Sequence, residues 1–404
     1  MSNARTVLVK QYVDATPADV YRAFTSRLAL RMWFCADAQV DPRVEGRIFL
    51  RWPDDYYAAG EFTRLEPGES LEWRWHGRGE LFPTEVSIAI SASGEGADIT
   101  VEHRGLGAGM DWDEQATEVE RRWAEGLENL ASVWGMTGLD LRQTRRPMLG
   151  IYLGGFVEGT EHGLPAGTRG MAISGTVENS GAKACGLLRG DIMTDLNGVS
   201  LTEQGSFGLA RNEKRAGDAV PMTFFRDGEK IDSTLTFSTP PSPPDVPNQP
   251  TELARIIEEQ YKAFAMELND ILGDVTDAEA SFHPSEGAWN VKEILAHLVL
   301  FERCFQQWLS MSVEGEELGA FAAGVPARVR AILARFSSVV ALRTELLACR
   351  TETVALLRGL TEPFVGRPEY VRMGQIIIGE AVHTTFHHEQ LRRTAESAKL
   401  QNVT

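Results

Sequence analysis

The sequence predicts a multi-domain α+β chain: an antiparallel sheet that grips one long helix, then a β-rich module, then an all-α four-helix bundle. Short alternating apolar segments separated by glycine or polar turns fill the first part of the chain. A proline-rich run follows the β-like region, and beyond it apolar residues recur at helical spacing. The predicted domains and linker are residues 1–139, 145–239, 240–250 (semi-rigid linker) and 251–398.

Composition and charge limit the classes of partner. The chain has 404 residues, which at roughly 100–200 residues per domain corresponds to two to four domains. Its 43% hydrophobic and 24% charged residues are ordinary for a globular protein. With 40 Lys and Arg against 57 Asp and Glu, the formal net charge is -17. A field of that sign repels phosphate backbones and anionic lipid surfaces, so we expect neither nucleic acid nor membrane partners.

The cysteines and the N-terminus indicate a cytoplasmic protein. The four cysteines, Cys35, Cys185, Cys304 and Cys349, contain no CxxC pair and lie among apolar residues, which is typical of reduced, buried thiols. The first residues lack the apolar core of a signal peptide. No apolar run approaches the roughly 20 residues that a spanning helix needs.

The first segment has the pattern of a sheet with one long helix. A short helix is expected over 16–26, with Thr16 as N-cap and Pro17 at its first position. A longer helix is expected over 113–135, with Val119, Trp123, Leu127, Leu130 and Trp134 facing the sheet. Strands are expected at 7–13, 46–52, 60–66, 70–76, 84–91 and 97–103.

Tryptophan is concentrated in this segment. Seven of the nine tryptophans lie here: Trp33, Trp52, Trp73, Trp75, Trp112, Trp123 and Trp134. A sheet curled around a helix and lined by large rings often leaves a cavity, so one hypothesis is a cup for a small apolar ligand. The alternative is that the rings simply fill the core.

The first segment as a whole resembles a known family. The runs DATPADVYRAFTS, VDPRVEGRIFLRW, GEFTRLEPGESLEWRW and RWAEGLENL occur in the order found in the Hsp90-ATPase-activator-homologue branch of the START-like (SRPBCC) fold. The resemblance covers the segment and implies a helix-grip fold. It implies little about function, because members of the family bind varied ligands.

The middle segment combines short strands with tight turns. A strand is expected over 171–177 and a short helix around 182–185. Asn197-Gly198 and Asp227-Gly228 are typical two-residue hairpin turns. A second short helix is expected from Phe207 to Arg211.

This pattern resembles the PDZ domains of bacterial HtrA-type proteases. The resemblance implies that the loop Leu149-Gly150-Ile151 offers backbone N–H groups to the C-terminal carboxylate of a peptide, and that the adjoining strand edge pairs with the peptide. It also implies a groove wall at Phe207 and Ala210. Residues 154–170 are expected to cap that groove. The sequence contains no GNSGG protease motif, and a spacer module without a peptide ligand is the alternative.

The third segment contains four amphipathic stretches, expected as helices over 251–275, 290–311, 337–359 and 373–397, with Thr251 as the first N-cap. Metal sites in helix bundles are commonly built from side chains on facing helices.

Three histidines on these helices predict a metal site. His383 and His387 are four residues apart and lie one turn above each other on one helix face. His297 is flanked at helical spacing by the apolar Ile294 and Leu298. Burying unpaired imidazoles costs about 1–3 kcal/mol each, which argues against three core histidines. Three nitrogens suit divalent Zn, Ni or Fe and leave coordination positions open.

The stretches around these histidines resemble DinB-family proteins. WNVKEILAHLVLFE is similar to the second-helix signature of that family, and HTTFHHEQL fits its HxxxHxxQ pattern. The resemblance implies His297, His383 and His387 as ligands, whereas a shift of one residue would put His388 in place of His387. His388-Glu389 does not begin an HExxH zinc-protease motif, because Arg392 stands at the second histidine position.

Two functions follow from these predictions. The favoured one is a multi-domain binding protein with an apolar-ligand cup, a PDZ-like peptide module and a three-histidine metal site. The alternative, implied by the DinB resemblance, is a metal-dependent thiol S-transferase or hydrolase, in which the ion favours a cofactor thiolate that attacks an electrophile. The sequence identifies no general base; Glu302 and Glu380, near the histidines, are the two carboxylate candidates.

Overall fold

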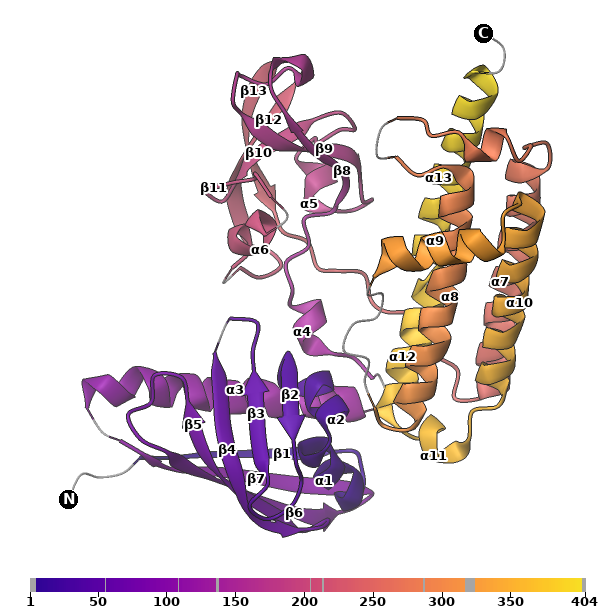
Figure 1. Cartoon of the computed structure of the whole chain (residues 1–404). Coiled ribbons are helices and arrows are strands. Elements are labelled where there is room, and N and C mark those ends of the chain that lie inside the picture. Colours follow the sequence, from indigo (N-terminus) through magenta and orange to yellow (C-terminus); the bar gives the residue numbers. More distant parts are fainter. Residues whose placement is uncertain are drawn as a thin grey trace. The chain divides into compact units, whose positions relative to one another are not determined.

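The computed structural model describes residues 5–54, 56–107, 109–135, 138–203, 205–212, 214–285, 288–316 and 324–401 (Figure 1). The chain forms two compact units, one of Asp140–Ser242 and one of Met1–Leu139 with Pro243–Thr404. The second unit contains a sheet domain and, later in the sequence, a helical domain. Within the described ranges, no helix has the length and hydropathy to cross a bilayer.

The sheet domain is a seven-stranded antiparallel sheet in the order β1-β7-β6-β5-β4-β3-β2, which confirms the predicted sheet. Figure 1 shows its long helix α3 (Met110–Trp134) running across the strands. Two short elements were not predicted, α2 (Arg27–Trp33) and β2 (Asp37–Val40), because each is too short to display a hydrophobic period. The other elements are β1 (Arg5–Val13), α1 (Pro17–Thr25), β3 (Arg47–Arg51), β4 (Tyr57–Glu66), β5 (Ser70–Gly77), β6 (Thr84–Ser93) and β7 (Gly96–Leu106).

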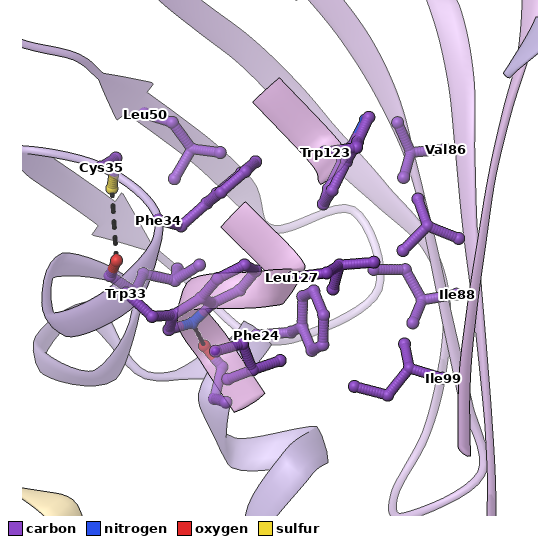
Figure 2. Close-up of a cluster of buried hydrophobic side chains, with 14 of the residues drawn as sticks. Phe24, Trp33, Phe34, Cys35, Leu50, Val86, Ile88, Ile99, Trp123 and Leu127 are labelled. Atoms are coloured by element: carbon purple, nitrogen blue, oxygen red, sulfur yellow. Dashed lines mark hydrogen bonds between the residues drawn. The ribbon is translucent and has the colours of Figure 1, made fainter. Parts of the chain in front are cut away.

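The predicted start of α1 and the predicted buried face of α3 are both confirmed. The Thr16 side chain accepts from the backbone N–H of Asp19, and Pro17 occupies the first turn. Figure 2 shows Trp123 and Leu127 of α3 pointing toward apolar side chains of the sheet, namely Val86, Ile88 and Ile99. Trp123 and Leu127 are both at most 1% exposed.

Close packing of α3 on α2 depends on Gly126. The ring of Phe34 stacks on Trp33 at 4.6 Å and on Trp123 at 4.7 Å between ring centroids. A Cβ atom at position 126 would lie 2.7 Å from Phe34 Cδ2. Alanine is normally the better helix former, so the glycine here serves the approach of the two helices.

A buried histidine links α3 to the sheet. His103 is fully buried, and its Nδ1 accepts from the indole N–H of Trp123 at 3.2 Å. An indole nitrogen can only donate, so Nδ1 carries no proton and Nε2–H donates to the Thr84 hydroxyl, 2.7 Å away. The hydroxyl in turn donates to the Trp75 carbonyl at 3.2 Å. Burial lowers the pKa of His103 to about 3, so the ring is neutral in the folded protein.

The neutral His103 predicts loss of stability in mild acid. An unfolded histidine takes up a proton near its ordinary pKa of about 6.5, whereas folded His103 does so only near pH 3. Between these pH values the unfolded state binds more protons than the folded state. The free energy of unfolding therefore falls as the pH is lowered, by up to about 1.4 kcal/mol per pH unit. Urea titrations followed by tryptophan fluorescence from pH 7 to 4 should give a shallower fall for His103→Gln. Equal slopes in both proteins would contradict this prediction.

The smaller unit is a separate sheet in the order β13-β12-β10-β9-β8, with β11 paired to β10. Asn197 and Asp227 have φ values of 53° and 51°, each followed by a glycine with positive φ, as expected for the two hairpin turns. Its elements are α4 (Leu141–Thr144), β8 (Ile151–Glu158), η1 (Thr160–His162), β9 (Arg169–Thr176), α5 (Gly181–Ala184), β10 (Ile192–Leu196), β11 (Val199–Ser200), α6 (Ser206–Ala210), β12 (Ala219–Arg226) and β13 (Glu229–Thr236).

Residues 154–170, expected to cap the peptide groove, contain the end of β8, the short helix η1 and the start of β9. Residues 154–158 belong to β8, which pairs with β9 from Ile151 opposite Thr176 to Glu158 opposite Arg169. The stretch therefore extends a hairpin, because its apolar Phe156 and Val157 continue the strand pattern.

The helical domain is a bundle of four long helices: α7 (Pro250–Leu272), α8 (Val291–Val313), α10 (Val339–Arg358) and α13 (Ala381–Gln401). Helices α7 and α8 each pack against both α10 and α13. This arrangement confirms the predicted all-helical region. Shorter helices complete it: η2 (Glu279–Ser281), α9 (Val325–Arg335), α11 (Glu362–Val365) and α12 (Pro368–Gly379).

Two sequence predictions for this domain are wrong, and one helix was missed. The N-cap of α7 is Gln249 rather than Thr251, because Pro250 takes the first helical position, where its missing N–H costs nothing. The predicted fourth helix is two helices, α12 and α13, which meet at Glu380 directly after the poor helix former Gly379. Helix α9 was not predicted at all.

The proline-rich linker is not a free spacer along its whole length. Tyr370 of α12 donates its hydroxyl hydrogen to the carbonyl of Pro247 at 2.7 Å. Val246 packs against Gly374, where a Cβ atom would lie 2.3 Å from Val246 Cγ1. The last part of the linker thus lies on α12, and the missing side chain of Gly374 permits the contact.

Candidate metal centre

The local sequence of α8 sets the position of His297. The helix begins with a capping box, in which Asn290 accepts from the Glu293 N–H and Glu293 accepts from the Asn290 N–H. With the start thus defined, Ile294 and Leu298 lie in the apolar core, at most 3% exposed. His297, between them in sequence, points toward α13.

The structure brings His297, His383 and His387 together. Nε2 of His383 lies 3.0 Å from Nε2 of His387 and 3.4 Å from Nε2 of His297. The ligand atoms of all three residues lie within 4.8 Å of one another. Two zinc–nitrogen bonds of about 2.0–2.1 Å at a tetrahedral angle separate their nitrogens by roughly 3.4 Å, so the spacing fits one ion.

The outer nitrogens of the α13 histidines already have partners. Nδ1 of His387 lies 2.9 Å from Oε1 of Gln390 and donates to it. Nδ1 of His383 lies 2.5 Å from Oε1 of Glu380, close but poorly aligned for a hydrogen bond, so that contact is mainly electrostatic. Both partners favour a proton on Nδ1 and leave Nε2 as a bare lone pair. Two lone pairs facing at 3.0 Å repel each other, and a cation between them would relieve the repulsion.

The environment lowers the pKa of two of these imidazoles, His297 and His387. Burial, reinforced by the neighbouring His383, lowers the pKa of His297 to about 4. Burial and the charge of His383 likewise lower the pKa of His387 to about 4, although the Gln390 hydrogen bond opposes the shift. Neutral imidazole is the form that binds metal ions.

His388 lies outside the cluster. It is fully buried, and its Nδ1 donates to Oε2 of Glu267 on α7 at 2.7 Å. Glu267 also pairs with Arg392 of α13 at 3.1 Å. In the structure His387, not His388, therefore lies with His297 and His383, while His388 joins α13 to α7. Glu267 was not singled out from the sequence, because no local pattern connects it to a residue 121 positions away.

The cluster is open to solvent. The side chain of His383 is 29% exposed, and that of the adjoining Glu380 is 19% exposed. His387 is only 6% exposed. The bundle is thus not closed over the three nitrogens, and water or a small ligand can reach this edge.

Glu302, the other candidate carboxylate near the histidines, is buried and bonded to side chains of the helical core. It pairs with Arg350 of α10 at 3.4 Å and accepts hydrogen bonds from Thr353 and Tyr261. Glu302 and Arg350 are both at most 6% exposed. Burial raises the pKa of Glu302, although Arg350 and the hydrogen bonds oppose the shift. Glu380, and not Glu302, lies directly against the histidine cluster.

The interior of the sheet domain is occupied by aromatic rings. Trp123 lies 5.9 Å from Trp75 and 6.2 Å from Trp73 between ring centroids, and Trp52 lies 6.1 Å from Trp75. All seven tryptophans predicted to line a cup are at most 8% exposed. These contacts favour the core-filling alternative around α3.

An open groove lies at the rim of this domain, beside the start of α3. Its volume is about 650 Å³, and Tyr56, Arg78, Glu80, Asp113, Glu114, Gln115, Thr117 and Glu118 line it. The buried Glu80 carboxylate accepts from the Trp75 indole, the Tyr56 hydroxyl and the Gly77 N–H. Burial raises the pKa of Glu80 against these hydrogen bonds. The lining is polar, unlike the apolar cup expected from the sequence.

The predicted peptide-binding residues are only partly exposed to a ligand. Leu149, Phe207 and Ala210 are at most 7% exposed and pack in the core of the smaller unit. Gly150 has a φ of 78°, and Ile151 begins the edge strand β8. The structure therefore keeps the loop and the strand edge together, but it buries the two side chains predicted for the groove wall.

Comparison with known proteins identifies two segments. Residues 14–135 match the family described as activator of Hsp90 ATPase homolog 1-like protein, and residues 260–394 match the DinB superfamily. The sheet domain is thus confirmed as a START-like domain of the Hsp90-activator type and the helical domain as a DinB-like domain. The PDZ resemblance of the smaller unit stays a prediction.

Solved structures similar to this chain correspond to about a third of its length. They include a protein of Mesorhizobium loti (19% identity, TM-score 0.29, 32% of this chain and 96% of that one). Another is the Aha1 dimer of Colwellia psychrerythraea (19% identity, TM-score 0.30, 33% of this chain and 97% of that one). A third is an HSP90 activator of Plasmodium falciparum (18% identity, TM-score 0.28, 32% of this chain and 94% of that one). No curated protein matches the chain.

The buried Glu302–Arg350 pair predicts a large effect of removing one partner. Arg350→Met leaves a buried carboxylate without its cation, so we expect a loss of about 3–5 kcal/mol in the free energy of unfolding. Arg358→Met is the matched control on the same helix, because Arg358 is 50% exposed in its pair with Glu258 and such pairs contribute only about 0–1 kcal/mol. Urea unfolding followed by circular dichroism measures both; similar losses would contradict the prediction.

Proposed function

We propose that the helical domain binds one divalent metal ion, Zn, Ni or Fe, through Nε2 of His297, His383 and His387. The observation that supports it is the convergence of three ring nitrogens whose closest separations are 3.0 and 3.4 Å. Gln390 and Glu380 hold the outer nitrogens of two of the rings, as is common for metal-bound histidines. The DinB superfamily match is consistent with a metal-associated domain.

Three nitrogen ligands leave coordination positions for water or another ligand. When bound, the ion would act as a Lewis acid that favours the thiolate form of a coordinated thiol at neutral pH. The 29% exposure of His383 supports access from solvent. Glu380 orients a ligand ring, so we assign it a positioning role rather than that of a general base.

The whole chain is best understood, we propose, as a multi-domain binding protein with the domain division 1–139, 145–239 and 251–398. A DinB-type S-transferase or hydrolase is the alternative function. In that case the nucleophile would come from a thiol cofactor. Burial raises the pKa of Cys349 to about 11 and raises that of Cys185 as well, so neither is activated as a protein nucleophile.

Peptide binding by the smaller unit is a second proposal. Neither Leu149 nor Gly150 has an acceptor for its backbone N–H within the described part of the unit, and the edge strand β8 exposes Tyr152 and Leu153 by 53% and 42%. Such an edge accepts an added strand. On α6 the exposed side chain is Leu209, 67% exposed, so we propose that it replaces the buried Phe207 and Ala210 as the groove wall.

Positive charge beside the loop supports a carboxylate ligand. Burial and then the nearby charge of Arg146 lower the pKa of Arg211. Arg146 comes three residues before Leu149, and within the residues that the structure describes neither arginine pairs with a carboxylate. Two neighbouring cations without an acidic partner favour an anionic ligand.

For the sheet domain, the proposal of a small-ligand site rests on the open groove rather than on the ring-filled interior. Its lining carries four acidic side chains and one arginine. A polar ligand therefore fits this groove better than the apolar ligand expected from the sequence.

The metal proposal predicts the metal content of variants. The full chain, purified without a histidine tag, should contain close to one transition-metal ion by mass spectrometry, and His383→Ala should lose it. Gln390→Leu should weaken zinc binding by about 10–100-fold, because His387 loses its orienting acceptor. Glu396→Gln, an exposed change on the same helix, should have no effect.

One more variant separates the two ligand registers. His388→Gln should keep the metal, since His388 faces Glu267. Equal metal content in His383→Ala and the unchanged chain would refute the site. Loss of the metal in His388→Gln with retention in His387→Gln would favour the other register.

The peptide proposal predicts a requirement for a free C-terminus. A fluorescent peptide that ends in valine should bind the full chain at least about tenfold tighter as the free acid than as the amide, because a carboxylate accepts charge-assisted hydrogen bonds. Arg146→Gln should weaken binding of the free-acid peptide. Lys230→Gln, an exposed charge change on β13, should leave that binding unchanged. Fluorescence anisotropy measures both. Equal affinities for the free-acid peptide and the amidated peptide would contradict the proposal.

A further inference from the structure

Each of the three histidines has an aromatic neighbour. The ring of Trp289 lies 5.0 Å from His297 and the ring of Phe301 lies 4.4 Å from His383. Phe386 lies 5.3 Å from His387. We call Trp289, Phe301 and Phe386 the aromatic collar. It comes from two sequence regions: Trp289 directly precedes the N-cap of α8 and Phe301 lies within α8, whereas Phe386 lies in the first turns of α13.

One side of the collar is exposed to solvent. Phe386 is 57% exposed, and Val382, one turn earlier on α13, is 71% exposed. Single exposed apolar residues are common on protein surfaces, so exposure alone implies nothing. Here the two side chains directly precede His387 and His383 in sequence, at the open edge of the cluster.

The polar groups closest to the cluster are already engaged. Glu380 lies against Nδ1 of His383, and Gln390 accepts from Nδ1 of His387. Both therefore contact the Nδ1 side of the rings, away from the converging Nε2 atoms. The aromatic side chains of the collar also contact these rings.

A bound ion would also limit the charge of its co-ligand. Aromatic faces attract cations, but a divalent ion a few ångströms away would repel a cationic ligand. A neutral aromatic group gains offset or edge-to-face contacts with the collar without this repulsion.

We propose that the three-histidine site takes an aromatic small molecule, which coordinates the ion through one donor atom while its ring packs against Phe386 and Phe301. This inference rests on the proposed metal site and adds the class of ligand. The preference for an aromatic group comes from the collar, and the affinity for the donor atom comes from the ion.

The test uses the full chain loaded with Co²⁺ and three alkyl thiols as probes: phenylmethanethiol, cyclohexylmethanethiol and ethanethiol. Binding is followed by the sulfur-to-cobalt charge-transfer band. We expect phenylmethanethiol to bind about tenfold tighter than ethanethiol and severalfold tighter than cyclohexylmethanethiol. Phe386→Ala should remove most of the preference. Leu400→Ala, which truncates another exposed apolar residue of α13, 72% exposed, should keep it.

The outcomes separate the inference from the metal proposal. Failure of the unchanged chain to bind Co²⁺ overturns the metal site itself. Normal Co²⁺ binding with equal affinity for all three thiols overturns only the aromatic preference, as does a preference that survives in Phe386→Ala. If light scattering finds a dimer that Phe386→Ala dissociates, Val382 and Phe386 form an interface between copies and the inference fails.

Discussion

The contact of α13 with α8 is the constraint on which the helical domain depends. It brings three histidine Nε2 atoms together, with closest separations of 3.0 and 3.4 Å. The rings are held by Gln390 on α13 and by Glu380 at the junction of α12 and α13, and His388 is bonded to Glu267 of α7. The helix that carries two candidate ligands is thereby joined to α7 as well as to α8.

Buried polar groups in this protein fall into two kinds, which differ in whether the protein satisfies them. His103 has both ring nitrogens hydrogen-bonded, to Trp123 and Thr84, and Glu302 has Arg350, Thr353 and Tyr261. Their hydrogen-bonding groups have partners inside the fold, so these residues stabilise the folded state. The three clustered histidines, of which His387 is buried and the other two are half-buried, instead direct their Nε2 atoms at one another at 3.0 and 3.4 Å. Because unsatisfied buried polar groups are costly, this difference separates a structural network from a candidate ligand site.

Prediction from the sequence was accurate where a pattern is long or chemically specific. The buried face of α3 and the two Asx-Gly turns at Asn197 and Asp227 are as expected, since helical periodicity and positive φ act locally. It was inaccurate where an element is short or a boundary depends on neighbours. Helix α2 and strand β2 have too few residues for a period, and the division between α12 and α13 follows one glycine. Residues 246–247, expected in a semi-rigid linker, pack on α12.

The sequence by itself determined that His383 and His387 share a helix face, because a spacing of four residues is one helical turn wherever the helix lies. Tertiary structure alone decided that His297, 86 residues before His383, approaches within 3.4 Å. It also decided that His388 turns toward Glu267, because adjacent residues on a helix point about 100° apart and packing selects which one faces the other two histidines. The same packing placed Phe386 beside the cluster. Spacing thus defined the candidate ligands, and helix packing decided which of them converge.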